Sequence, residues 1–507
     1  MNPLFASERP RAAVFAASVA VAVAFAATPA LAQPQDAKTV ATKAGAYKPE
    51  QAEARNMREV GYDDLQARTA YQPTPKKQGD RWILYVGHHG GRQVNPLTGQ
   101  EEENGTSILD VTDPKNPKYL FHIPGEKGKV VPGRETGGSQ MTRVCNGEEL
   151  PKGEKGHTYL LRTWGDSGHE VYDVTAPEKP VKIASIDGFT STHKNDWECS
   201  TGIALIVGSG TKEKWRATRV TTFYDLSDPK NPKKIREYAL PEQLSSAKGY
   251  NPGQIHGPIS RPDLNRVFFG YGTNRRGVAQ IVDREKLLKG DAEPTPESLK
   301  EAEIGRLNLP EFMGAHTTFP LYGMPVPNFA HDKEGKVRNF LVIVNEESVT
   351  VCGEPRQMVE FVDVTDEKRP MGVATFDVNE RSGRFCDRGG RFGAHATNEH
   401  VTPIYDKRVL FVSYFNAGVR AIDVRDPYHP REAGYFIPAI NKNTDPRCAD
   451  EVNNTNCTKV IQINNMEVDD RGYIYAVDRA NAGLFILEPT GDLRRIANFP
   501  RNQSVNR

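Results

Sequence analysis

"ILDVTDPKNP", residues 108–117, is the stretch of sequence that decides the fold, because the chain repeats it. Close copies begin at Val171, Phe223, Phe361 and Ala421 and read "VYDVTAPEKP", "FYDLSDPKNP", "FVDVTDEKRP" and "AIDVRDPYHP". In each copy a short apolar run ends at an aspartate, which favours a turn, and a later proline prevents the strand from continuing. The phrase therefore predicts the same strand–turn–strand unit wherever it occurs.

Further strand-like runs surround each phrase. Two precede it, for example "NFLVIVN" at 339–345, and one follows it, for example "KYLFHI" at 118–123. Four short strands per unit, repeated from end to end without a linker, are typical of propeller blades. We therefore expect an all-β fold, a seven-bladed β-propeller of four-stranded antiparallel blades, with two separate β domains as the alternative. The seven units lie at about 66–125, 136–188, 190–242, 253–310, 313–380, 392–440 and 462–500.

Two units depart from the phrase. Unit four has only "QIVDREK" at 280–286, and unit seven has "FILEPTGD" at 485–492, so the sequence defines their outer strands least well. The stretch "MREVGYDDL", Met57–Leu65, is similar to "PREAGYFI", the closing strand of unit six at 430–437. We expect this N-terminal stretch to complete the last blade and close the ring.

The phrase, preceded by a strand such as that in "AGVRAIDVRDP" at 417–427, resembles the repeat of the LVIVD-repeat proteins. The resemblance covers about 60–500, nearly the whole chain after its first segment. It implies an exported β-propeller, and it implies no particular activity, because that family has no common biochemical assignment.

The ends of the chain have a different character. Arg9 and Arg11 precede an apolar run from Ala12 to Ala27 and the small residues up to Ala32, which is the layout of a cleaved secretory signal peptide. A retained membrane anchor is the alternative. We expect a signal peptide at 1–32, a flexible arm at 33–56, one propeller at 57–500 and a tail at 501–507. The protein is then periplasmic or secreted, with no membrane span after cleavage.

The charge and the cysteine content of the chain limit the classes of function that the sequence supports. Removal of the signal peptide leaves 64 of the 66 Lys and Arg residues against 64 of the 65 Asp and Glu residues, so nothing favours nucleic-acid binding. Six cysteines in an exported protein favour disulfides, although six allow 15 pairings. Local spacing favours Cys448 with Cys457 and Cys352 with Cys386, and the repeat brings Cys145 near Cys199.

Histidines recur at the start of the predicted first strands. His193, His256, His316 and His395 occupy this position in units three to six, in "STHKNDWE", "QIHGPIS", "GAHTTFP" and "GAHATNE". The other units place Gln72, Gln140 and Asn465 there. The first strand of each blade lines the central channel, so equivalent positions form a ring. Four of only 12 histidines in the chain are therefore predicted to face one channel mouth.

Four imidazoles at one mouth suit a transition metal such as Cu, Fe or Zn. Nearby carboxylates at Glu198, Glu399 and Glu467 are candidates to hydrogen-bond the second ring nitrogens, as metal-bound histidines usually require. Two alternatives remain open: a polar channel without metal, and histidines that only satisfy backbone groups.

Other polar residues are candidates for a supporting role. His88 and His89, in "GHHGG" at 87–91, either face the same mouth or belong to a plain loop. Arg391, with Arg384 and Arg388, lies in the glycine-rich loop before His395, where the arginines could hold an anionic substrate or only form a charged surface.

The sequence thus predicts an exported propeller that binds a transition metal and acts oxidatively on a small molecule at the channel mouth. A non-enzymatic scaffold for an envelope protein or polymer is the second candidate. A metal-assisted hydrolase is the third.

Overall fold

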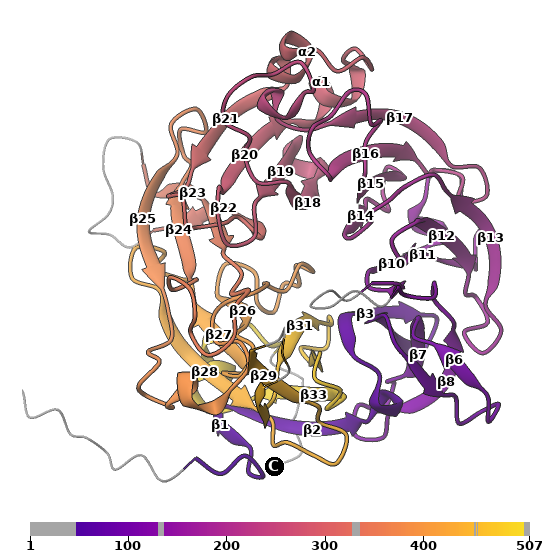
Figure 1. The fold of residues 1–507 in the computed structure, drawn as a ribbon, viewed down its shortest axis with the longest axis vertical. Helices are drawn as coiled ribbons and strands as arrows, with labels where there is room; N and C mark the ends of the chain where they lie inside the picture. The colour runs from indigo at the N-terminus through magenta and orange to yellow at the C-terminus, as the bar shows by residue number, and fades with distance from the viewer. Residues whose placement is uncertain (1–46, 130–135, 327–334, 451–452, 454, 501–507) are drawn as a thin grey trace, which may run out of the picture. The chain divides into compact units, whose positions relative to one another are not determined.

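Four-stranded antiparallel sheets stand around a common centre in the computed structural model, which describes residues 47–129, 136–326, 335–450, 453 and 455–500 (Figure 1). The ring has seven such blades, so the predicted all-β propeller is confirmed. The first blade consists of β3 (Ala70–Gln78), β4 (Arg81–His89), β7 (Thr106–Asp110) and β8 (Lys118–Ile123), with β9 (Gly138–Ser139) added to β4. A small hairpin, β5 (Arg92–Val94) and β6 (Glu101–Glu103), extends from it.

The next four blades follow the sequence units in order. Blade 2 is β10 (Thr142–Asn146), β11 (Thr158–Trp164), β12 (Gly168–Asp173) and β13 (Val181–Ile186). Blade 3 is β14 (Asn195–Trp197), β15 (Ile203–Gly208), β16 (Val220–Asp225) and β17 (Lys233–Tyr238). Blade 4 is β18 (Ile255–Arg261), β19 (Arg266–Tyr271), β20 (Val278–Asp283) and β21 (Glu303–Asn308). Blade 5 is β22 (Thr317–Pro325), β23 (Val337–Val344), β24 (Val359–Asp363) and β25 (Met371–Phe376).

The last two blades each take a strand from the N-terminal end of the propeller. Blade 6 is β26 (Val409–Ser413), β27 (Val419–Asp423), β28 (Arg431–Ile437) and β1 (Glu53–Arg55). Blade 7 is β31 (Ile463–Val468), β32 (Ile474–Asp478), β33 (Leu484–Pro489) and β2 (Met57–Asp63). The predicted closure of the ring by 57–65 therefore takes place through β2. Residues 53–55, which the sequence placed in the arm, form β1 and pair with β28.

The repeated phrase builds the same turn in each unit that carries it. The side chain of Asp110 accepts a hydrogen bond from the backbone N–H of Thr112, and Asp225 and Asp363 do the same two residues onward. One β-bulge also recurs in blades 1 to 6, between the strand that ends at the aspartate and the strand that follows it. A bulge increases local twist, so its repetition gives the blades a common curvature.

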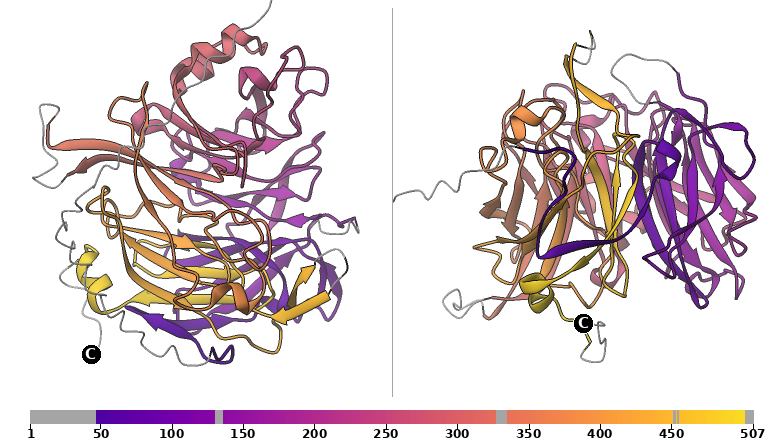
Figure 2. Two further views of the ribbon diagram at one scale, coloured as in Figure 1. Left: turned by 60° about the vertical axis from the view of Figure 1, so that its left-hand side comes forward. Right: turned by 90° about the horizontal axis from the view of Figure 1, so that it is seen from below.

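Units four and seven, which depart from the repeated phrase, form blades that differ from the others at the position of the phrase. In blade 4, Asp283 caps a short helix, α1 (Arg284–Lys289), instead of starting the usual turn. A second helix, α2 (Pro296–Glu301), follows, and both lie at the outer edge of the blade (Figures 1 and 2). In blade 7, α3 (Gly491–Ile496) follows β33, and β2 takes the outer position.

The apolar core lies within and between neighbouring blades. Phe340 and Phe361 of blade 5, for example, share one buried cluster with Val412 and Ile422 of blade 6. Two such faces packed together exclude water from both sides of each sheet, and this burial supplies the main stabilising free energy. The inner edges of the sheets are left to line the channel.

All six cysteines form disulfides, and the three pairs are those that the sequence favoured. Cys145–Cys199 joins β10 of blade 2 to the turn after β14 of blade 3. Cys352–Cys386 joins two loops. Cys448–Cys457 links the strands of a hairpin, β29 (Pro446–Asp450) and β30 (Thr455–Lys459), which projects from the ring (Figure 2).

Three disulfides indicate that the protein folds in an oxidising compartment. The predicted signal peptide, most of the predicted arm and the predicted tail lie outside the described residues. Among the described residues, no helix is long and apolar enough to cross a membrane.

Candidate metal centre

The four predicted histidines meet at one place. The Nε2 atoms of His193 and His256 are 2.8 Å apart. The ring centroids of His256 and His316 are 3.6 Å apart, and those of His316 and His395 are 4.3 Å apart. The imidazoles of blades 3 to 6 thus form a continuous arc at the channel, and the side chains of all but His193 are almost fully buried.

These side chains face the channel because their residues stand outside the regular strand pairing. His256 occupies the bulge between Ile255 and Gly257 in β18. His316 immediately precedes the first residue of β22, and His193 lies two residues before the first residue of β14. In blade 6 the inner segment forms no strand, because the side chains of Asn398 and Ser413 accept hydrogen bonds from backbone N–H groups that a strand would pair. Bulges and strand ends can redirect a side chain, as functional sites often require.

The second ring nitrogen of each histidine has its own partner. The Nδ1 atom of His256 is 3.1 Å from the backbone oxygen of His316, and that of His395 is 2.7 Å from the backbone oxygen of Asn464. The Nδ1 atom of His193 is 2.8 Å from Oε1 of Gln140, the side chain that the sequence placed in the ring. An oxygen of this kind only accepts, so each of these three Nδ1 atoms carries the proton. Their Nε2 atoms therefore carry lone pairs.

These lone pairs create a need for a cation. Two of them face each other at 2.8 Å between His193 and His256. Burial lowers the pKa of all four imidazoles well below 6.5, which disfavours an added proton. A transition metal bound about 2 Å from each nitrogen would hold two such atoms about 3 Å apart. Within the described part of the chain, the Nε2 atom of His316 is buried without a hydrogen-bond partner, so it offers a further ligand.

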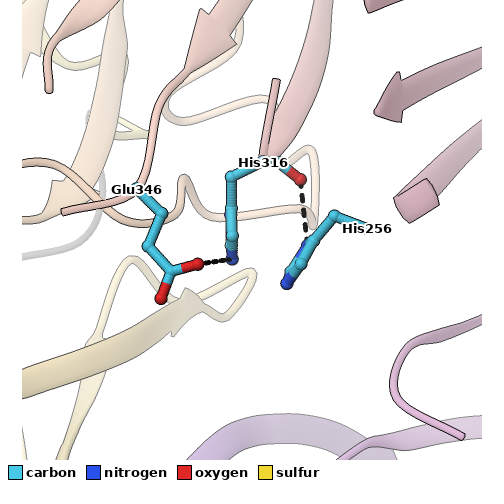
Figure 3. A group of neighbouring side chains, drawn as sticks. All are labelled: His256, His316 and Glu346. Atoms are coloured by element: carbon cyan, nitrogen blue, oxygen red, sulfur yellow. Dashed lines mark hydrogen bonds and ion pairs between the residues drawn. The ribbon is translucent and has the colours of Figure 1, made fainter. Parts of the chain in front are cut away.

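A carboxylate completes the group. Glu346, in the loop after β23, places one oxygen 3.9 Å from Nε2 of His316 and the other 3.8 Å from Nε2 of His395. Figure 3 shows Glu346 and His256 on either side of His316. The ligand atoms of these three residues lie within 4.8 Å of one another, so they could hold a metal ion. Burial raises the pKa of Glu346, and the positive charge of Arg391 opposes this shift.

Tyr71 also belongs to this group. Its hydroxyl is 3.3 Å from Nε2 of His193, and its ring contacts the rings of His89, His193 and His395 at centroid distances of 5.0, 5.5 and 6.2 Å. Burial raises the pKa of Tyr71, so its hydroxyl stays protonated and can donate a hydrogen bond.

Gln72 and Asn465 do not contact the histidines, contrary to their predicted place in the ring. The amide of Asn465 donates to Oε1 of Gln72, and Nε2 of Gln72 lies 3.4 Å from Glu467. The reason is the bulge in each strand, which shifts the ring position by one residue. Tyr71 and Asn464 therefore take the places at the cluster.

The three predicted carboxylates bind other partners as well. Glu399 forms ion pairs with Arg143 and Lys194 in the channel interior, and these two cations hold its pKa at about 2 despite the opposing effect of burial. Glu467 accepts hydrogen bonds from the backbone N–H groups of Glu399 and His400.

Glu198 is the third of these carboxylates, and it pairs with Arg284. Backbone carbonyls and Gln140 thus have the role that these acids were expected to have, because the inner strands carry the acids further along the channel.

The auxiliary candidates separate into two groups. His89 and Arg391 lie at the cluster, His89 against Tyr71 and Arg391 with Nη1 3.4 Å from Glu346. His88 points to the other side of β4, where its Nε2 is 2.8 Å from the hydroxyl of Ser107.

The other two arginines of the glycine-rich loop also lie elsewhere. Arg388 pairs with Glu53 at 2.7 Å, and Arg384 pairs with Asp387. Of the three, Arg391 is the one that contacts the histidine cluster.

A second repeated position could have identified Glu346. It is the sixth residue after Phe340, which pairs with Asp363, the aspartate that ends β24. The same count from Ile83 in blade 1 reaches His89, and from Val409 in blade 6 it reaches Phe415. Both lie at the cluster, so the positions that follow the second strands of blades 1, 5 and 6 also face it.

No protein-family model matches the chain, and no curated protein is significantly similar to it in sequence. Among solved structures, Sqt1 from Chaetomium thermophilum is similar at 10% identity and a TM-score of 0.49, over 87% of this chain and 100% of that one. Sqt1 bound to the N-terminus of the ribosomal protein L10 gives 10% identity and a TM-score of 0.48, over 85% and 99%.

Raptor from the same organism is similar at 10% identity and a TM-score of 0.47. The similarity covers 88% of this chain, which spans 30% of the length of Raptor.

Proposed function

We propose that this protein is an exported metalloprotein that binds one transition metal ion at the channel mouth and uses it for oxidative chemistry on a small molecule. The Nε2 atoms of His193, His256, His316 and His395 are the proposed ligands, with Glu346 beside them. Cu, Fe and Zn are the candidate metals, because imidazole nitrogen suits them better than Ca or Mg.

One observation gives the main support for the proposal. Three of the histidines donate Nδ1–H to fixed oxygens, so their Nε2 lone pairs are directed to one place, where two lie 2.8 Å apart. Metal-bound histidines usually have this arrangement, since the outer hydrogen bond fixes the tautomer and the ring orientation. Histidines that only satisfy backbone groups would have no reason to direct their other nitrogens at one another.

The surroundings support chemistry on a substrate. A redox-active ion at this place would supply electron transfer to or from a bound molecule, which is the basis for preferring oxidation over hydrolysis. Tyr71 can donate a hydrogen bond toward the same place, and the burial of the cluster excludes bulk water. The three disulfides are consistent with the proposed periplasmic or extracellular location.

Elemental analysis of the purified mature protein tests the proposal. We expect about one transition metal ion per chain in the wild type after reconstitution and loss of that ion in the double variant His256→Ala/His316→Ala. The matched control is His157→Ala/His429→Ala, because both imidazoles pair with aspartates of outer turns, Asp173 and Asp426, away from the segments that carry the proposed ligands. This control should keep the metal.

Wild-type protein that holds no stoichiometric metal after reconstitution with Cu, Fe or Zn would refute the proposal. Redox activity with bound Cu or Fe would support the oxidative function. Hydrolytic activity confined to the Zn form would instead assign the protein to the hydrolases.

A further inference from the structure

The channel holds a cavity of about 380 Å³ at the end away from the histidine cluster. Every blade contributes to its lining, which includes Lys76 of β3, Asp196 of β14 and Phe319 of β22. Asp196 follows His193 by three residues, and Phe319 follows His316 by three. A strand rises about 3.3 Å per residue, so the lining lies about 10 Å further along the channel than the histidines. The cavity is therefore separate from the candidate metal centre, and it has room for a small molecule.

Buried charged side chains form a network at this cavity. The carboxylate of Glu399 pairs with Arg143 and, at 2.8 Å, with the almost fully buried Lys194. The Nε atom of Arg143 also lies 3.7 Å from Oδ1 of Asp196. Glu467 is the third carboxylate, and it accepts hydrogen bonds from two backbone N–H groups. Two cations thus meet three carboxylates in this network.

The more exposed charges of the lining are balanced. They form pairs of opposite charge, which are Lys76 with Glu149, His400 with Asp470 and Arg261 with Asp263. Lys77, the remaining cation of the lining, is exposed to solvent, so water screens its charge. The surplus of acid therefore belongs to the buried network, where an additional cation would compensate it.

Asp196 is the carboxylate of this network with capacity for a further partner. Its two oxygens accept hydrogen bonds from the backbone N–H groups of Trp197 and Ser260, at 2.9 and 3.0 Å. Among the described residues its cationic partner is Arg143, which it shares with Glu399 and which lies beyond hydrogen-bond distance of it. The side chain of Asp196 is 21% exposed and that of Glu399 is 11% exposed, so Asp196 is the more accessible of the two from the cavity. A carboxylate can accept about four hydrogen bonds, so Asp196 can accept more.

The lining of the cavity also has an apolar part. Ile259 and Phe319 are buried, and Val401 is 38% exposed at the surface. Trp197 belongs to the lining as well, and its buried Nε1–H has no acceptor in the part of the chain that the structure describes. Because buried polar groups usually have a partner, this donor indicates that the protein alone does not satisfy the polar groups around the cavity.

We propose that this cavity is a second ligand site and that it binds a small organic cation, an ammonium group joined to an apolar body. The carboxylate of Asp196 accepts the ammonium group, and the apolar body lies against Phe319 and Val401. Pairing with a carboxylate offsets the cost of removing an ammonium group from water, whereas an anion would add to the surplus of acid. None of the proposed metal ligands lines the cavity, so the inference is independent of the proposed function.

Calorimetric titration of the metal-free protein tests the inference with three probes of similar shape. They are 2-phenylethylamine, 2-phenylethanol and phenylacetate, which are cationic, neutral and anionic at neutral pH. We expect the amine to saturate a single site, and the alcohol and the acid to bind at least ~10-fold more weakly, since neither carries the charge that Asp196 recognises. The affinity for the amine should fall as salt increases, because the interaction is electrostatic.

Substitution then locates the site. Asp196→Asn should weaken amine binding by ~10-fold or more, although the amide oxygen can still accept from Ser260. Val401→Lys should also weaken it by ~10-fold or more, because it adds a like charge to the lining at an exposed position. Asp366→Asn is the matched control, since Asp366 lies in the outer turn before β25 with its side chain 47% exposed. Thermal unfolding identifies any variant that does not fold, and a folded member of the pair decides the outcome.

The double variant His256→Ala/His316→Ala separates this site from the histidine cluster. It should bind the amine as the wild type does, because neither histidine lines the cavity. Any of four results would overturn the inference. These are no saturable binding of the amine, equal or tighter binding of the alcohol or the acid, unchanged affinity in the folded Asp196→Asn and Val401→Lys variants, and loss of binding in the folded histidine variant.

Discussion

The atom that contacts each Nδ1 decides which nitrogen of a channel histidine can bind a cation. For His256 and His395 that atom is a backbone oxygen, so the tautomer is set by the fold itself. For His193 it is the side chain of Gln140, which a single substitution can remove. The tautomer that leaves the lone pair on Nε2 is therefore set by the backbone for His256 and His395, whereas for His193 of blade 3 it depends on the side chain of Gln140.

His169 in β12 is a buried histidine that differs from the channel histidines in its hydrogen bonding. Neither of its ring nitrogens has a hydrogen-bond partner in the part of the chain that the structure describes, and burial lowers its pKa from 6.5 to about 3. Between pH 6.5 and 3 the unfolded chain binds a proton that the folded protein does not. The free energy of unfolding therefore decreases as the pH falls through this range.

We predict that His169→Leu removes this part of the pH dependence. Between pH 7 and 5 the wild type should lose about 2 kcal/mol more stability than the variant, measured by denaturant unfolding at each pH. The control His429→Gln alters an exposed imidazole and should keep the wild-type profile. Parallel profiles for the wild type and His169→Leu would contradict the prediction.

At the scale of the residue, the sequence predicted the histidine cluster in part. The four histidines could be found because they recur at one point of a repeat. Tyr71 and Asn464 could not be predicted, because a bulge moves the channel position by one residue and has no signature in the repeated sequence. Glu346 follows a second strand, so the recurrence of residues in the first strands gives no sign of it.

At the scale of the strand and the turn, the phrase determines the blade. Its aspartate closes the turn, its proline precedes the outer strand, and the bulge recurs at the same place. Unit four shows the converse, because without the second Asp-Pro its Asp283 caps α1 instead. The number and order of blades could therefore be predicted, whereas the helices between β20 and β21 replace the phrase and could not.

We predict that removal of the turn aspartate has the same effect in different blades. Asp225→Ala and Asp363→Ala should each lower the free energy of unfolding by about 1 kcal/mol, because each exposes a backbone N–H that the side chain now satisfies. Chemical denaturation measures the change. The control is Asp80→Ala, in the exposed turn between β3 and β4, and a cost for this variant equal to the others would contradict the explanation.

The loops of the site are connected by a covalent bond. Cys352 belongs to the loop after β23, which carries Glu346, and Cys386 belongs to the loop that carries Arg391. The disulfide therefore joins the two segments whose side chains meet at 3.4 Å. This bond restricts the separation of the loops, so it helps to keep the carboxylate and the guanidinium in place.

At the scale of the whole propeller, closure depends on close contact between blade 7 and blade 1. Gly61 of β2 lies against the turn of the first phrase, where an added Cβ atom would be 1.8 Å from the backbone oxygen of Pro114. No side chain fits this space without movement of the backbone. The contact is thus the tightest constraint on how the first and last blades approach each other in β2.

We predict that Gly61→Ala destabilises the propeller by about 1–3 kcal/mol, since the methyl group forces the closing strand away from blade 1. Gly372→Ala is a matched control in β25, the outer strand of blade 5, where an added Cβ atom meets nothing within 4 Å. It should be neutral or slightly stabilising. Thermal unfolding compares the two, and equal effects would show that the contact at Pro114 does not constrain closure.

The pairing of β2 with β33 joins the two ends of the propeller, so the ring can close only late in folding. Arg58 and Glu488 form an ion pair across these strands although 430 residues separate them. The ribosome makes β2 near the beginning of the chain and β33 near its end. The ring therefore stays open between blade 1 and blade 7 until the last blade has been made. Contacts this distant in sequence are slow to form. The histidine cluster can therefore be complete only after the last blade has been made, because Nδ1 of His395 contacts the backbone oxygen of Asn464 in blade 7.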